Sequence, residues 1–187
     1  FFAVAMTAEM KLMGFDNFGR KINLNGMSEE ILVSPDGKNA VAKVRGSKSP
    51  LDPDYFQYIM DHPEEASNPG IYFFGFDGRN YGPYSSSSFR DAWYTESGQL
   101  VIFANPEVYL DGKLLGKTGA SVAACDLWIS PDGRSFAWAN YETLAFSDGT
   151  SYAAPIVIAR TEENGRQILK WLTLEEGKNL VFYQRPW

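Results

Sequence analysis

Carboxylates carry most of the chemistry that this chain could perform. An acidic residue recurs two places before an apolar residue that opens a repeated sequence pattern: Glu30 before Leu32, Asp91 before Trp93 and Asp126 before Trp128. Carboxylates serve as general acids and bases, and as cation ligands, when the fold brings them together. The three residues therefore suggest either a cation- or amine-binding ring or the acid–base groups of a hydrolase or lyase. The alternative interpretation is that they are solvated, or paired with neighbours such as Arg90.

Composition restricts other catalytic chemistry. One Cys among 187 residues excludes an internal disulfide, a thiolate zinc site and an iron–sulfur cluster, and one His excludes a multi-histidine metal site. We interpret Cys125 as a small buried hydrophobe and His62 as a charge at a helix C-terminus. The sequence contains no Gly-x-Ser-x-Gly elbow, P-loop or dinucleotide fingerprint. We therefore expect no catalytic residue, no metal and no cofactor, and we favour a protein that is not an enzyme.

Charge and hydropathy limit the partners of the chain. A formal net charge of −6 argues against nucleic-acid binding. No run reaches the roughly 18 apolar residues that a membrane span needs. The chain begins at Phe1 and not at Met, so we expect a processed form or a piece of a longer protein. Phe1–Ala5 has features of a signal-peptide end, but we interpret it as an ordinary strand.

The aromatic content points to β structure. The chain has 13 Phe, 10 Tyr and 5 Trp, and aromatic residues favour strands. Trp93, Trp128 and Trp171 occupy matched positions in the sequence, so we expect them in the core. Tyr55, Phe56 and Tyr58 stand outside this pattern, and we expect them to be exposed contact residues.

One pattern organises the chain. An apolar pair, Ser or Thr, a few turn residues and Gly precede an alternating apolar run at four places: 32–37, 93–98, 128–133 and 171–177. Pro, Asp and Gly in the complete copies suit a tight hairpin turn. A second tight turn, marked by Asp, comes before each of these hairpins, at Asp16, Asp77, Asp111 and Asp148. The repeat predicts units of four short antiparallel strands, as in a β-propeller blade, with a β-sandwich as the alternative.

The two complete copies support a family resemblance. Trp128–Trp138 and Ser34–Val44 resemble the WD40-like repeat, with its Ser-Pro-Asp-Gly turn, of Tol-type bacterial propellers. The copies at Thr95 and Thr173 lack Pro-Asp. The resemblance implies one all-β propeller domain over 1–187 with about four blades, and a periplasmic or cell-surface location. The blades would comprise residues 30–85, 91–117, 126–159, and about 1–25 with 167–187. The terminal strands would either share the last blade and close the ring, or belong to a larger propeller.

An insertion at 45–70 interrupts the repeat. Asp52-Pro53 is a helix-start signal, and Tyr55, Phe56, Ile59 and Met60 give one apolar face. Pro63 would end the helix. We therefore predict one short helix of about two turns in this insertion.

The resemblance also places the candidate residues. It puts Glu30, Asp91 and Asp126 at the starts of innermost strands, around the mouth of a channel, on the face that carries the insertion and the loops between blades. Loops on a rigid frame often carry binding sites. We therefore expect a module that binds a protein or peptide through this face, with possible self-association through open blade edges. The candidate binding residues are Glu30, Asp91, Asp126, Tyr55, Phe56, Tyr58 and Arg90. A hydrolase or lyase that uses the carboxylates, and a carbohydrate-binding propeller, are the alternatives.

Overall fold

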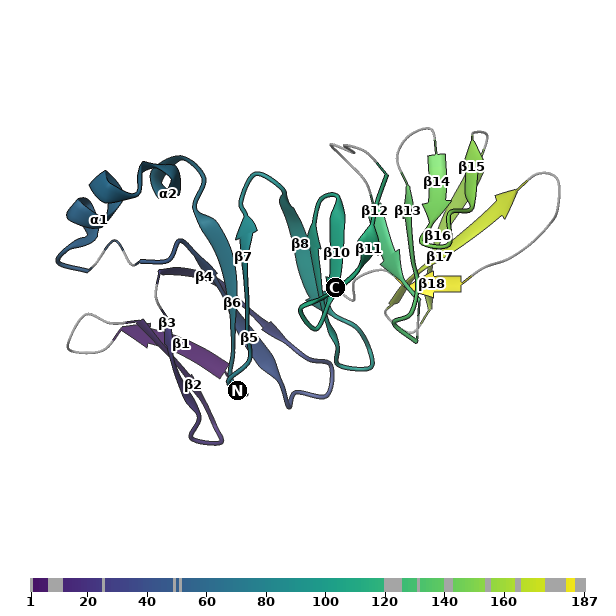
Figure 1. The fold of residues 1–187 in the computed structure, drawn as a ribbon. Coiled ribbons are helices and arrows are strands. Elements are labelled where there is room, and N and C mark those ends of the chain that lie inside the picture. The colour runs from purple at the N-terminus through teal and green to yellow at the C-terminus, as the bar shows by residue number, and fades with distance from the viewer. Residues whose placement is uncertain are drawn as a thin grey trace. The chain divides into compact units, whose positions relative to one another are not determined.

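The regular secondary structure of the described residues consists mostly of β-strands (Figure 1). The computed structural model describes residues 2–6, 12–24, 26–48, 50, 52–119, 126–130, 132–139, 143–153, 156–163, 166–173 and 181–183. These residues form eighteen strands and two short helices, which confirms the predicted all-β class. Neither helix within these ranges is long and apolar enough to cross a bilayer. The chain divides into two compact units, Phe1–Arg90 and Asp91–Trp187, and each is described by itself.

The first unit contains a three-stranded and a four-stranded antiparallel sheet. The three-stranded sheet has the order β1 (Phe2–Met6), β2 (Leu12–Asp16), β3 (Lys21–Leu24). The four-stranded sheet has the order β4 (Met27–Val33), β5 (Ala40–Arg45), β6 (Gly70–Gly75), β7 (Asn80–Ser85). The sequence predicted four antiparallel strands in this order between residues 30 and 85, and the structure confirms them.

An apolar cluster joins the two sheets of the first unit. Leu24 from β3 is buried with Ala42 and Val44 from β5, and Val4, Ile22 and Phe74 pack against them. β5 is buried along most of its length because both of its faces are covered. This explains its nearly continuous apolar sequence, since only a strand with one solvated face needs alternating polar residues.

The insertion forms two helices where one was predicted. α1 spans Tyr55–Asp61 and α2 spans Pro63–Ser67. α1 begins two residues later than the Asp52-Pro53 signal suggested, with Asp54 at its N-cap. Pro63 does end α1, because a proline has no N–H to donate to the preceding turn. The prediction of one helix was wrong because the same proline suits a first helical turn, and it therefore also starts α2.

The topology places the insertion away from the tight turns. In the antiparallel order β4-β5-β6-β7, the β4–β5 and β6–β7 turns lie at one end of the sheet. The β5–β6 connection, which carries both helices, lies at the other end (Figure 1). The loop after β7 shares that end, so the insertion and this loop can form one surface.

The second unit begins with another four-stranded antiparallel sheet. Its order is β8 (Phe89–Tyr94), β9 (Leu100–Ala104), β10 (Glu107–Leu110), β11 (Lys113–Lys117). These bounds agree within two residues with the strands predicted for 91–117. The next four strands, also in sequence order, are β12 (Asp126–Ile129), β13 (Phe136–Ala139), β14 (Thr143–Phe146) and β15 (Ser151–Ala153).

The last part of the chain departs from the predicted plan. The blade plan implied by the resemblance makes 151–159 the last strand of the blade over 126–159, but β15 ends at Ala153, and β16 (Ile156–Glu163) pairs with β17 (Arg166–Thr173). β17 pairs with β18 (Val181–Tyr183), as the hairpin pattern predicted, and β18 joins β12 in a seven-stranded sheet. The single-domain and shared-blade arrangements stay predictions, because the two units are described separately.

The core of the second unit contains two of the three marker tryptophans. Trp93 from β8 and Phe136 from β13 belong to one buried cluster, which joins the sheet of β8–β11 to that of β12–β15. Trp128 is 1% exposed in a second cluster with Ala137 and Leu144. The prediction that these side chains lie in the core is therefore confirmed for Trp93 and Trp128. The side chain of Trp171 lies outside the described part of the structure.

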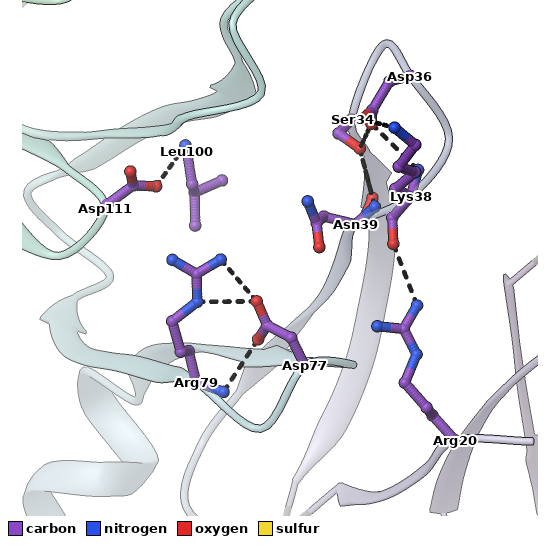
Figure 2. A network of polar contacts seen from close by, with 9 residues as sticks. All are labelled: Arg20, Ser34, Asp36, Lys38, Asn39, Asp77, Arg79, Leu100 and Asp111. Carbon is purple, nitrogen blue, oxygen red and sulfur yellow. Dashed lines mark hydrogen bonds and ion pairs between the residues drawn. The ribbon is translucent and has the colours of Figure 1, made fainter. Parts of the chain in front are cut away.

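The tight turns share one hydrogen-bond arrangement. Ser34 Oγ donates to Asp36 Oδ1 at 2.6 Å and accepts from the backbone amide of Asn39 at 2.9 Å (Figure 2). The backbone amide of Lys38 donates to Asp36 Oδ1 at 3.1 Å. Ser130 and Asp132 form the corresponding bonds at 2.6 and 3.0 Å. In the copy at 93–98, which lacks Pro-Asp, the hydroxyls of Thr95 and Ser97 hydrogen-bond with each other at 2.9 Å. The Thr95 hydroxyl also accepts a hydrogen bond from the backbone amide of Gln99. A hydroxyl therefore replaces the carboxylate without loss of the turn.

We expect Asp36→Asn to flatten the acid dependence of stability. Hydrogen bonds from the Ser34 hydroxyl and the Lys38 amide lower the pKa of Asp36. This contribution is complete above the unfolded-state pKa and is lost as the pH falls through the lowered folded-state pKa. The free energy of unfolding of the wild type should therefore fall more steeply than that of Asp36→Asn between about pH 5 and pH 2. Urea denaturation at several pH values measures both slopes, and parallel curves would contradict the prediction.

Candidate binding surface on the insertion

Large apolar side chains point into solvent on α1. Phe56 is 84% exposed and Met60 is 78% exposed. They stand at i and i+4, so they are neighbours on the helix surface. The half-buried Tyr55 ring lies 6.2 Å from the Phe56 ring at an interplanar angle of 69°. We call Tyr55, Phe56 and Met60 the apolar ridge.

Tyr58 points to the opposite side and anchors the helix. Its hydroxyl hydrogen-bonds with the Ser47 hydroxyl, in the segment that follows β5. Its ring lies 4.6 Å from the His62 ring, and the Lys48 ammonium lies 5.4 Å from its centre. Tyr58 was predicted to be an exposed contact aromatic, but in the structure it is half-buried and its hydroxyl contacts Ser47. It holds α1 so that Phe56 faces outward.

Several polar contacts fix the rest of the insertion. The Gly46 amide donates to the Gly70 carbonyl at 2.8 Å, which closes the base of the insertion. Asn68, after α2, accepts hydrogen bonds from the Ser86 hydroxyl at 2.7 Å and the Ser87 amide at 3.1 Å. The Ser85–Ser88 loop therefore supports α2. An insertion held at its base and at its end has less backbone freedom to lose on binding.

The segment that carries the ridge is acidic. Residues 52–68 contain five acidic residues and no Lys or Arg. Lys48 lies just outside this range and pairs with Asp54, and this interaction lowers the pKa of Asp54. Asp61 accepts a hydrogen bond from the neutral Gln57 amide at 3.0 Å, and Glu64 lies 3.4 Å from His62. We call Asp61 and Glu64 the acidic rim.

Glu30 lies in an ion-pair cluster on the four-stranded sheet of the first unit. A β-bulge between Ser28 and Glu30 makes Glu29 an extra residue in β4. The Lys43 ammonium lies 3.2 Å from Glu29 and 3.9 Å from Glu30, and 4.8 Å from the Phe89 ring centre. Burial acts to raise the pKa of Glu29, but hydrogen bonds and charges from Arg45 and Lys43 lower it overall. A lowered pKa is the opposite of what a general acid needs near neutral pH.

The other predicted site residues lie apart from the ridge in sequence. Half-buried Asp91 accepts a hydrogen bond from the Ala92 amide at 2.8 Å. Arg90 is exposed and donates to the Ser87 carbonyl at 3.0 Å and the Phe89 carbonyl at 3.2 Å. Asp126 is the first residue of β12, opposite Ala139, and its side chain is outside the described residues. Because Glu30 and Asp91 belong to different units, the convergence of the three carboxylates stays a prediction.

The residue types that commonly bind metal ions do not gather in the described part of the structure. No group of three or more His, Cys, Asp or Glu residues with metal-site geometry occurs among the described residues. His62 lies at the C-cap of α1, where the sequence placed it, and Cys125 is outside the described ranges.

Met60 and the acidic rim were missed as candidate site residues. The i, i+1, i+4, i+5 pattern placed Met60 on one apolar face with Tyr55, Phe56 and Ile59, but Met60 was not among the candidate binding residues. No residue of α1 or α2 is buried. The available signal was the density of acidic residues in 52–68, because a segment with so many carboxylates is not easily covered by the sheet.

Comparisons with known proteins do not identify the chain. No protein-family model and no curated protein sequence matches it. TolB from Acinetobacter baumannii is similar at a TM-score of 0.37 and 16% identity, over 98% of this chain and 51% of TolB. A putative 6-phosphogluconolactonase from Bacteroides fragilis is similar at a TM-score of 0.35 and 12% identity, over 91% of this chain and 62% of that protein. Both TM-scores lie below 0.5, so these likenesses do not establish a shared fold.

Proposed function

We propose that the chain is a non-enzymatic binding module that recognises a protein or peptide segment through the apolar ridge. The observation that carries the proposal is the exposure of Phe56, at 84%, on a helix fixed by Tyr58. Full burial of one such side chain against a partner is worth about 1.5–3 kcal/mol. Anchors of this kind, placed in a partner's pocket, dominate many protein interfaces.

The proposed architecture is a β-propeller built from the four-stranded antiparallel sheets. Three consecutive sets of four strands run in sequence order within their sheets: β4–β7, β8–β11 and β12–β15. The first two strands of each set are joined by turns with closely similar hydrogen bonds, at Ser34, Thr95 and Ser130. Radial repetition of such units is a common way to protect sheet edges. This arrangement would present the insertion on a rigid frame.

The ion pairs of Glu29 argue against a general-acid role for that carboxylate. Glu29 and Glu30 face Lys43, and Arg45 also pairs with Glu29. These cations stabilise the ionised form of Glu29, as its lowered pKa indicates. Such pairs stabilise the bulge of β4.

A peptide selection tests the proposed function. A random 12-residue peptide library displayed on phage would be selected against the immobilised chain, and the enriched peptides measured by fluorescence anisotropy. We expect Phe56→Ser with Met60→Ser to weaken their binding by about tenfold or more, because the apolar contact is lost. Circular dichroism should show an unchanged fold, because both side chains are exposed.

Phe18→Ser supplies the matched control. Phe18 is also a largely exposed phenylalanine of the first unit, at 65%, but it lies in the β2–β3 turn. Its replacement should leave peptide binding within about twofold, since a surface substitution away from a binding site has little effect. Enriched peptides that bind equally to the wild type and to the Phe56/Met60 variant would overturn the proposed function.

A further inference from the structure

We propose that the segment recognised by the ridge is basic, with an apolar side chain flanked by Arg or Lys. This inference rests on the proposed function and adds the chemical class of the partner. The apolar anchor would contact Phe56 and Met60. The cationic residue would contact the acidic rim, formed by Asp61 and Glu64.

The charge distribution around the ridge carries the inference. Within 52–68, acidic residues number five and Lys or Arg none. The cation nearest to this range in the sequence, Lys48, is engaged by Asp54 and by the Tyr58 ring. The acidic rim lies outside that pair, because Asp61 accepts from the uncharged Gln57 amide and Glu64 lies beside His62. A partner with the opposite sign therefore meets a favourable potential, and an acidic partner is repelled.

The sequence position of the rim indicates where the cationic residue of the partner would bind relative to its apolar anchor. Asp61 directly follows Met60, and Glu64 lies in the first turn of α2. In the sequence, the carboxylates therefore lie at the C-terminal end of the ridge. Arg suits this place better than Lys, because its planar guanidinium can form paired hydrogen bonds with a carboxylate.

The expected contribution of the rim is moderate. Ion pairs between exposed groups change affinity by small factors each and are weakened by salt. Two such contacts correspond to about a threefold to tenfold change in dissociation constant at low salt. The effect should appear mainly in the association rate and in the salt dependence, as for other charges at the rim of an interface.

Three labelled peptides test the partner's chemistry. Each would have twelve residues in a Gly/Ser background: one with Leu-Phe flanked by two Arg on each side, one with Glu in place of Arg, and one with Ser-Ser in place of Leu-Phe. Fluorescence anisotropy at about 50 and 300 mM NaCl spans a large change in screening. At the lower salt concentration, we expect the Arg/Leu-Phe peptide to have a dissociation constant about tenfold lower, or lower still, than either of the other two peptides.

Two charge variants separate the rim from net charge. Asp61→Asn with Glu64→Gln should weaken binding of the Arg/Leu-Phe peptide by about threefold to tenfold and reduce its salt dependence. The control, Glu96→Gln with Asp148→Asn, removes the same formal charge from exposed turns of the second unit. It should leave binding within about twofold.

The outcomes distinguish the inference from the proposed function. Three outcomes would overturn the basic-partner inference. The Arg and Glu peptides could bind equally well, the peptide without Leu-Phe could bind as well as the Arg/Leu-Phe peptide, or the rim variant could leave binding unchanged. Loss of binding by library-selected peptides in the Phe56/Met60 variant would still support the proposed function in that case. Insensitivity of those peptides to Phe56 and Met60 would overturn the proposed function itself.

Discussion

Replacing Gly26 with Ala is expected to destabilise the first unit by about 2–5 kcal/mol. Gly26 is buried between β3 and β4, and its φ is +127°. A side chain rarely adopts this backbone conformation, and a Cβ here would lie 2.4 Å from the Gly46 carbonyl oxygen and 2.7 Å from Val44 Cγ1. The first of these neighbours is backbone and cannot rotate away, so the chain must shift at the end of β5. That shift would disturb the base of the insertion.

Gly37→Ala isolates the steric part of this effect. Gly37 also has a positive φ, at +69°, but apart from its chain neighbours no residue has a heavy atom within 4 Å of the place that a Cβ would take. Its replacement should cost only about 1–2 kcal/mol for the backbone conformation. The difference between the two variants therefore measures crowding against Gly46 and Val44.

The measurement must report on the first unit. All five Trp residues lie after residue 90, so tryptophan fluorescence reports on the second unit. Urea denaturation followed by far-ultraviolet circular dichroism, with hydrogen exchange of amides in β5 and β6, covers the first. Equal losses of stability for Gly26→Ala and Gly37→Ala would show that the close approach of Gly26 to Gly46 does not matter.

Strands were predictable from sequence because their determinants are local. The segments around Val41, Ile71 and Val101 combine apolar runs with turn residues at both ends, and such runs cannot be solvated as isolated loops. The structure contains strands at each of these places. The hydroxyl-based turn at Thr95 was also predictable, because Ser97 can replace Asp as the hydrogen-bonding partner.

The wrong predictions have two physical causes. Pro63 ends one helix and begins the next, and both roles follow from its missing N–H and restricted φ. The segment 151–159 was assigned to one strand, but β15 ends at Ala153, and β16 pairs with β17, the next strand along the chain. Tertiary structure decides which strands pair, and a run of apolar residues alone does not specify the partner.

The candidate site was only partly predictable for a similar reason. Phe56 was expected to be exposed and is exposed. Tyr58 has nearly the same local sequence context, yet it faces the chain after β5, because Ser47 and Lys48 lie there to receive it. The rotation of a short helix about its own axis decides which side chains face solvent. This rotation depends on such contacts and not on the composition of the helix. Whether Glu30, Asp91 and Asp126 converge depends on the arrangement of whole sheets, which local patterns do not encode.

Trp128→Ala should destabilise the second unit by about 3–5 kcal/mol. Trp128 is 1% exposed and stands opposite Ala137 across the β12–β13 pair. Its buried neighbours include Ala137, Ala139 and Leu144. Alanine side chains have no flexible atoms with which to fill the space left by an indole, so most of the cavity would persist. The loss is a large part of the roughly 5–15 kcal/mol that stabilises a typical domain.

A graded series distinguishes this cavity effect from a general loss of apolar surface. Trp128→Phe keeps a ring in the site and should cost less than Trp128→Ala, because the cost of a cavity rises with its volume. Leu114→Ala removes apolar atoms from a side chain that is 53% exposed on β11, and it should cost less than about 1 kcal/mol. Urea denaturation followed by the fluorescence of the remaining Trp residues gives each free energy of unfolding. A cost for Trp128→Ala as small as that for Leu114→Ala would mean that the marker tryptophan fills no space of its own. The repeated Trp-x-Ser/Thr pattern would then reflect turn chemistry alone and not the packing of the sheets.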